Sequence, residues 1–117
     1  MMGSACDVTF HGLPHSPALE SLVQERAHWL QQFVPGATGV RALVDVPHRH
    51  RHEHATRVQL RIAVADDEPI TVEREDVGDV YALVRHTFDI AHRRLQDTVR
   101  EQRGFVKTHP HVSRRAV

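Results

Sequence analysis

Residues 40–64, VRALVDVPHRHRHEHATRVQLRIAV, contain two alternating stretches separated by a run rich in histidine. In residues 40–46 and again in residues 57–64, apolar side chains occupy every second position, and most positions between them are polar or charged. This period of two is typical of a strand with one buried face. Pro47 lacks a backbone N–H and should end the first stretch. The pattern predicts two antiparallel strands, with the histidine-rich run in their connection.

On the N-terminal side of this pair, the sequence predicts a short strand followed by a helix. Residues 6–10, CDVTF, are the candidate strand. The Ser16 hydroxyl can accept from free amides of a first helical turn, and Pro17 suits the first helical position. The segment PGATG should end this helix near Val34. One helical face is predicted to be buried and carries Leu19, Leu22, Val23, Leu30 and Phe33, with Trp29 at its edge.

On the C-terminal side, PITVER at residues 69–74 predicts a third, shorter strand of the sheet. A long helix should follow over about residues 79–103, capped by Asp79 or Asp76 and ended by Gly104. Its apolar stripe consists of Val80, Val84, Ala91 and Leu95, with Thr87 and Thr98 beneath them.

These elements predict an α+β fold with the order β-α-β-β-β-α. It should form a four-stranded mixed sheet with two helices packed on one face, and the first helix allows the first two strands to pair in parallel. The length of the chain suits one domain, placed at residues 5–104, with residues 105–117 as a flexible tail. The sheet face away from the helices should be wet, because it carries Arg41, Arg57, Gln59 and Arg61.

The charges of the chain balance but are segregated along the sequence. There are 15 basic and 15 acidic residues, yet residues 62–84 are mainly acidic and residues 85–117 mainly basic. Such asymmetry indicates a polyanionic partner, or else only a solvated face in each segment. Cys6 is the single cysteine, so an intramolecular disulfide is impossible, and we expect a reducing, cytoplasmic location. No segment has the length of a membrane span or the pattern of a signal peptide.

The predicted second helix has a basic side opposite its apolar stripe. In one interpretation this side is a solvent face with salt bridges, in which Asp89 pairs with Arg85 and Arg93. In the other it contacts phosphates, because guanidinium groups match phosphate geometry. Since the side lacks aromatic residues, it favours backbone recognition over base stacking. Its members are Arg85, Asp89, His92, Arg93, Gln96, Arg100 and Arg103.

Arg26 interrupts the apolar stripe of the first helix between Leu22 and Leu30. Its aliphatic stem could lie along the core while its head reaches water. Alternatively, Arg26 emerges between the two helices and extends the basic surface.

The chain resembles the ribosome hibernation-promoting factor family. This family includes ribosome-associated inhibitor A, the ribosomal-subunit-interface proteins and the sigma-54 modulation proteins. The resemblance covers about residues 7–107, and its best markers lie on the two helices. They are Leu19, Leu30 and Phe33 on the first helix, and DVYALVRHTFD with the later RRL on the second.

The resemblance implies a stress or stationary-phase factor that is not an enzyme and needs no cofactor. Members of the family bind the small ribosomal subunit and its ribosomal RNA in the decoding cleft, and they silence translation. No DNA or membrane partner is expected, and the unbound protein should be a monomer or a weak dimer. Basic residues on both helices carry the binding in this family. Arg26 lies where the family commonly has lysine, and Arg93 matches a basic position of the second helix.

The chain departs from the family pattern at two places. Gln96 and Asp97 occupy part of a run that is richer in lysine in typical relatives. Longer relatives add a dimerisation domain or a cold-shock-like domain, and neither fits in the residues that follow the second helix here. We therefore expect action through one domain. The predicted RNA-binding residues are Arg26, Arg49, Arg51, Arg85, His92, Arg93, Arg100, Arg103 and Lys107.

The histidine-rich run permits several interpretations. In an extended strand, His48, His50, His52 and His54 point to one side. A closed zinc site needs about four ligands in a tetrahedral array, and no cysteine or well-placed carboxylate is near. Catalysis by a histidine pair would need an orienting partner that the sequence does not identify. A solvated loop is the simplest alternative.

The interpretation that we favour is a hairpin tip that contacts RNA. Arg49 and Arg51 would supply permanent charge, and the histidines would add charge as the pH falls. Affinity for RNA should then rise between about pH 7.5 and pH 6 at constant salt. A binding titration across this range tests the hypothesis, and a constant affinity would remove it.

Two other classes of function stay open. One is a metal-binding or metal-sensing module built on residues 48–54. The other is a protein-interaction module that uses the acidic segment from Asp66 to Asp79.

Overall fold

The computed structural model describes residues 6–34, 36–46 and 55–107, with side chains described as far as Glu101. Its elements follow the order β-α-β-β-β-α. They are β1 (Cys6–His11), α1 (Pro17–Phe33), β2 (Ala37–Asp45), β3 (Ala55–Val64), β4 (Ile70–Val77) and α2 (Val80–Lys107).

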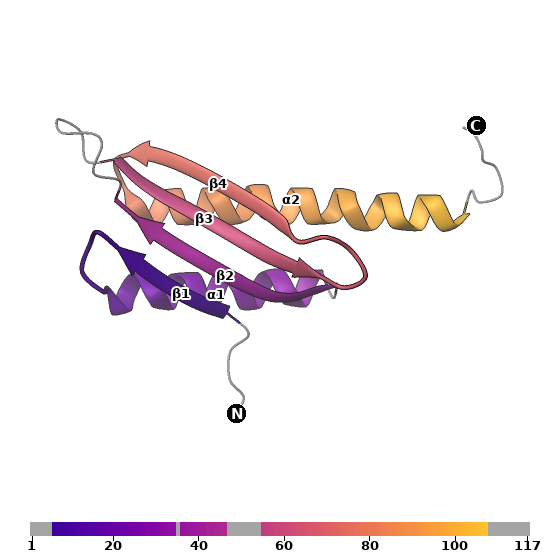
Figure 1. Ribbon diagram of the computed structural model, residues 1–117, viewed down its shortest axis with the longest axis horizontal. Coiled ribbons are helices and arrows are strands. Elements are labelled where there is room, and N and C mark those ends of the chain that lie inside the picture. The colour runs from indigo at the N-terminus through magenta and orange to yellow at the C-terminus, as the bar shows by residue number, and fades with distance from the viewer. Residues whose placement is uncertain (1–5, 35, 47–54, 108–117) are drawn as a thin grey trace, which may run out of the picture.

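The four strands form one sheet in the order β1-β2-β3-β4. β1 pairs in parallel with β2, and α1 makes the crossover between them, whereas β2–β3 and β3–β4 are antiparallel. Both helices lie on the same side of the sheet and run side by side, with α1 against β1 and β2 and α2 against β3 and β4 (Figure 1). The predicted α+β fold with a mixed sheet and one covered face is confirmed.

The core lies between the sheet and the two helices. Alternate residues of β2 and β3 point into it, as the period of two predicts, and Val58, Leu60 and Ile62 have no exposed surface. From the helices, Leu30, Phe88 and Leu95 are equally buried. Phe88 is the largest fully buried side chain of the described residues, although the predicted stripe of the second helix left it out.

The predicted caps are present at both helix starts. The Ser16 Oγ accepts from the Leu19 amide at 3.2 Å, and the Asp79 Oδ1 accepts from the Tyr81 amide at 3.0 Å. Both oxygens satisfy backbone donors that have no partner within the helix. The turn before α1 requires glycine at position 12. Gly12 has a φ of 83°, and a Cβ atom there would lie 2.8 Å from the Val46 carbonyl oxygen.

Two local predictions are wrong. Phe33, predicted on the buried face of α1, is 61% exposed, because it lies in the last turn of the helix and packs sideways against other rings. The second helix does not end at Gly104 but continues to Lys107. A single glycine inside a helix costs about 1 kcal/mol relative to alanine, which is too little to stop a helix of 28 residues. The C-terminal turns of α2 extend beyond the ends of the strands (Figure 1).

Candidate functional site

Four side chains meet where α1 and α2 run alongside each other. The Trp29 ring centroid lies 4.8 Å from that of His92 and 5.0 Å from that of Phe33. Phe33 also approaches His92, with centroids 6.2 Å apart. The guanidinium carbon of Arg26 lies 5.8 Å from the Trp29 ring centroid, within cation–π range. We call Arg26, Trp29, Phe33 and His92 the inter-helix cluster.

The spacing along each helix explains this cluster. Arg26, Trp29 and Phe33 follow one another at three and four residues, so they share one side of α1. His92 contacts two of them from α2, which identifies this side as the one nearest the second helix. Arg26 therefore emerges between the helices, which is one of the two interpretations that the sequence allows. The residue is half-buried, and its guanidinium group lies beside the indole ring of Trp29.

The inter-helix cluster reaches solvent. Arg26, Trp29 and His92 are half-buried, while Phe33 is largely exposed. An exposed ring beside a guanidinium group offers a surface on which an unpaired nucleobase can stack. From the sequence, the basic side of the second helix lacks aromatic residues. That is correct along α2 alone, but α1 supplies Trp29 and Phe33 from beside it.

The arginines of α2 extend the positive surface outward from the cluster. Arg85 and Arg93 are exposed, and neither forms an ion pair with a carboxylate that the structure describes. The anticipated pairing of both with Asp89 is therefore not found. Arg100 approaches Asp97 at 3.4 Å, but a surface pair of this kind contributes at most about 1 kcal/mol. These guanidinium groups keep their capacity to bind phosphate.

The structure brings together five of the predicted RNA-binding residues. Arg26 and His92 belong to the inter-helix cluster, and Arg85, Arg93 and Arg100 lie along the exposed part of α2. Arg103 and Lys107 belong to the last turns of α2, where side chains are not described. Arg49 and Arg51, with the four alternating histidines, lie outside the described residues. Within the described ranges, no three histidine, cysteine or acidic side chains gather closely enough to hold a metal.

A buried carboxylate organises one end of the open sheet face. Asp45 is 5% exposed, and its Oδ2 lies 2.6 Å from Nη2 of Arg57. Its Oδ1 lies 3.0 Å from Nδ1 of His11. The hydrogen bond from His11, followed by the hydrogen bond and charge of Arg57, lowers the pKa of Asp45 against the opposing effect of burial.

Replacing Asp45 with asparagine should destabilise the protein in a pH-dependent way. At pH 7 we expect a loss of about 2 kcal/mol, because Arg57 loses a charged partner. The lowered pKa means that the ionised carboxylate stabilises the fold above its ordinary pKa of 3.8, and that this contribution is lost as the pH falls through the lowered value.

Urea unfolding of the wild-type protein and of Asp45→Asn at pH 7 and at about pH 3 measures this difference. Asp7→Asn, an exposed carboxylate on the same face, is the matched control and should change the unfolding free energy little. If the unfolding free energies of Asp45→Asn and wild type differed by the same amount at both pH values, the ionised Asp45 carboxylate would not be the stabilising group.

The thiol of Cys6 is not poised for nucleophilic chemistry. The side chain is 5% exposed, and burial, with the nearby charges of Asp7 and Glu20, raises the pKa of the thiol to about 11. A nucleophilic cysteine has a depressed pKa, because the thiolate is the reactive form. The structure thus gives no support to a nucleophilic role for Cys6.

The solved structures that share the fold include the following two. A ribosomal subunit interface protein from Coxiella burnetii is 17% identical, with a TM-score of 0.66 over 80% of this chain and 94% of that one. The N-terminal domain of Protein Y from Thermus thermophilus is 15% identical, with a TM-score of 0.65 over 79% of this chain and 94% of that one. No curated protein sequence matches the chain.

No helix in the described part of the chain is long and apolar enough to cross a membrane.

The family model described as "Sigma 54 modulation protein / S30EA ribosomal protein" matches residues 6–103, from the start of β1 to the last turns of α2. The match covers most of the chain. It confirms the family resemblance that the sequence motifs of the two helices indicated. The chain belongs to this family, which is that of the ribosome hibernation-promoting factors.

Proposed function

We propose that this protein binds the small ribosomal subunit near its decoding cleft and silences translation under stress. Membership of the family supports association with the ribosome. The proposal of a specific site rests on the inter-helix cluster, which Arg85 and Arg93 continue along α2. Both arginines are exposed and pair with no described carboxylate. The protein acts by binding ribosomal RNA in the cytoplasm and catalyses no reaction on it.

The helix side offers two kinds of contact to RNA. Arg85, Arg93 and Arg100 bind phosphates and release the counterions that neutralised them, which gives a favourable and salt-dependent free energy. Phe33 and Trp29 offer ring surface to an unpaired base, with Arg26 beside them. Exposed bases and closely spaced phosphates occur together in the single-stranded regions of structured RNA, so this surface suits such a site better than a regular duplex.

Cosedimentation with purified small ribosomal subunits across a salt series tests the proposal. We expect binding at low salt, with the logarithm of the association constant falling linearly with the logarithm of the salt concentration. A protein that binds neither small subunits nor structured RNA at low salt would exclude the proposed function. Translation of a reporter messenger RNA in a purified system, measured with increasing protein, then tests silencing separately from binding.

No observation in the described residues favours the metal-binding alternative. The four alternating histidines are outside them, and the described side chains supply no group of three metal ligands. The acidic segment from Asp66 to Asp79 is largely exposed, but nothing about it identifies a protein partner.

A further inference from the structure

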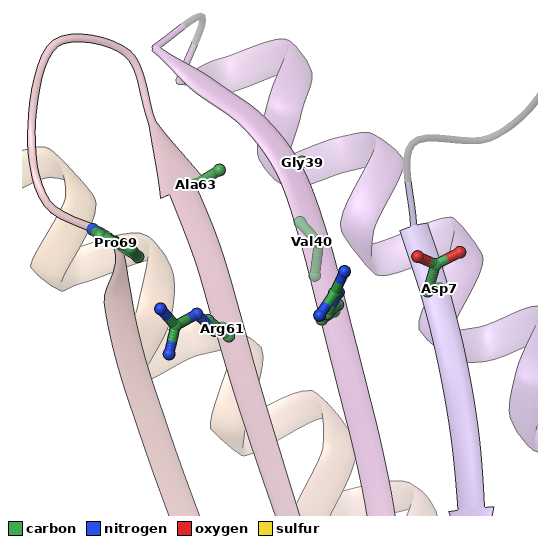
Figure 2. Close-up of a pocket in the computed structure, with 7 residues that line it drawn as sticks. Asp7, Gly39, Val40, Arg61, Ala63 and Pro69 are labelled. Atoms are coloured by element: carbon green, nitrogen blue, oxygen red, sulfur yellow. The ribbon is translucent and has the colours of Figure 1, made fainter.

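The sheet face that the helices leave uncovered carries two arginines directly opposite each other. Arg41 of β2 and Arg61 of β3 are partners in the antiparallel register. Both are exposed, and both line each of two hollows of about 330 and 620 Å³ on this face. In the smaller hollow, Arg61 and Asp7 stand on the outer side of the sheet, with the helices behind it (Figure 2).

This pair of arginines is energetically unfavourable by itself. Directly opposed side chains on antiparallel strands have Cβ atoms about 4.5–5.5 Å apart, and like charges at that position destabilise a sheet. Neither Arg41 nor Arg61 forms an ion pair with a carboxylate of the described residues. Asp7 is the register partner of Arg41 on β1, yet it makes no ion pair with it in the described structure.

Arg57 lies on the same open face but, unlike Arg41 and Arg61, has carboxylate partners. Arg57 donates to the buried Asp45 and also lies 3.8 Å from Glu73. Glu73 in turn accepts a hydrogen bond from Gln59 at 3.1 Å. The carboxylates of Asp45 and Glu73 are thus engaged by Arg57 and Gln59. The two arginines farther along the strands form no ion pair with a described carboxylate, and with Asp7 beside them they leave a net positive charge around the hollows.

We infer that Arg41 and Arg61 form a second anion site, which binds a phosphate of an RNA strand on the face opposite the helices. Two guanidinium forks at adjacent register positions can hold one phosphate by charge-assisted hydrogen bonds, and an anion between them removes their repulsion. The residues lining both hollows include no aromatic side chain, so the contact is to the sugar-phosphate backbone.

This inference rests on the proposed function only for the source of the phosphate, which we take to be RNA. It also extends that function, because a protein that binds phosphates on both faces can lie between two RNA segments rather than on one.

The site itself is tested with inorganic phosphate. The full chain is titrated with phosphate at an ionic strength held constant with chloride, while NMR follows the backbone and guanidinium N–H signals of Arg41 and Arg61. We expect saturable shifts in the wild-type protein and none in Arg41→Gln/Arg61→Gln. Arg94→Gln removes one exposed arginine of α2 and should leave the titration unchanged. Shifts that do not saturate, or that persist in the double variant, would overturn the site.

The occupant is tested with a single-stranded RNA of mixed sequence and, in parallel, with polyglutamate. For Arg41→Gln/Arg61→Gln we expect RNA binding to weaken about 3- to 10-fold and the salt slope to fall by about 1. Polyglutamate binding should be weak and equal in both proteins. If the double variant lost polyglutamate binding but kept RNA binding, the partner would be an acidic protein segment and the inference would be wrong.

Failure of this inference is distinguishable from failure of the proposed function. If Arg41→Gln/Arg61→Gln cosediments with small subunits like wild type while Arg85→Glu/Arg93→Glu does not, only the second site is refuted. If wild type itself does not cosediment, the proposed function is refuted, and the phosphate titration still decides whether the anion site exists.

Discussion

Reversing the charge of Arg85 and Arg93 together is expected to reduce binding to small ribosomal subunits about 10- to 100-fold at moderate salt. Each substitution removes a phosphate contact and places a carboxylate where a phosphate should lie. Both side chains are exposed and pair with no described carboxylate, so their replacement leaves no acidic partner behind. Arg100 is less suitable, because it approaches Asp97. Cosedimentation across a salt series measures both the affinity and its dependence on salt.

Arg94→Glu is the matched control for this experiment. It lies next to Arg93 on α2 and makes the same change of charge, but its guanidinium group donates to the Thr71 carbonyl of β4, on the side of the helix away from the inter-helix cluster. We expect it to retain most of the affinity. If Arg93→Glu and Arg94→Glu reduce binding equally, the protein responds only to total charge, and the proposed interface on the helix side is wrong.

Truncating Phe88 to alanine should lower the free energy of unfolding by about 3–5 kcal/mol. Phe88 has no exposed surface and lies in the core that α2 forms with the sheet, so its removal leaves a cavity that the surrounding residues fill only partly. For a domain of this size, such a loss lowers the melting temperature by more than about 10 °C. Urea denaturation followed by circular dichroism measures the change.

Phe33→Ala provides the comparison for this prediction. The chemical change is the same, but Phe33 is largely exposed, and we expect its truncation to lower the unfolding free energy by less than about 1 kcal/mol. Similar losses for the two variants would show that Phe33 supports the core, as its position in the sequence first indicated.

The sequence predicts the fold well where its signals are periodic. Alternation in residues 40–46 and 57–64 identifies β2 and β3, because one sheet face is buried and a shift by one residue would expose every apolar side chain. The side chains of Ser16 and Asp79 mark the helix starts because they bond to backbone amides within their own turn. These signals are local, so they can be read without knowledge of the tertiary structure.

The parts that the sequence does not predict depend on neighbours distant in the chain. Periodicity places Phe33 with the core residues of α1, but only the position of His92 on α2 shows that the ring packs at the rim. The opposition of Arg41 and Arg61 depends on the register of two strands, which the connection between them does not specify. The burial of Asp45 likewise depends on His11, which is brought to it by the parallel pairing of β1.

The length of α2 beyond the sheet has an energetic consequence. Its final turns have no strand beneath them, and an isolated helical segment of that length is marginal in water. Amide protons there should exchange with solvent far sooner than those around Leu95, and an RNA that contacts Arg103 would have to oppose this fraying. Part of the intrinsic binding energy would then be consumed in ordering the helix end, so the measured affinity would understate the strength of the contacts themselves.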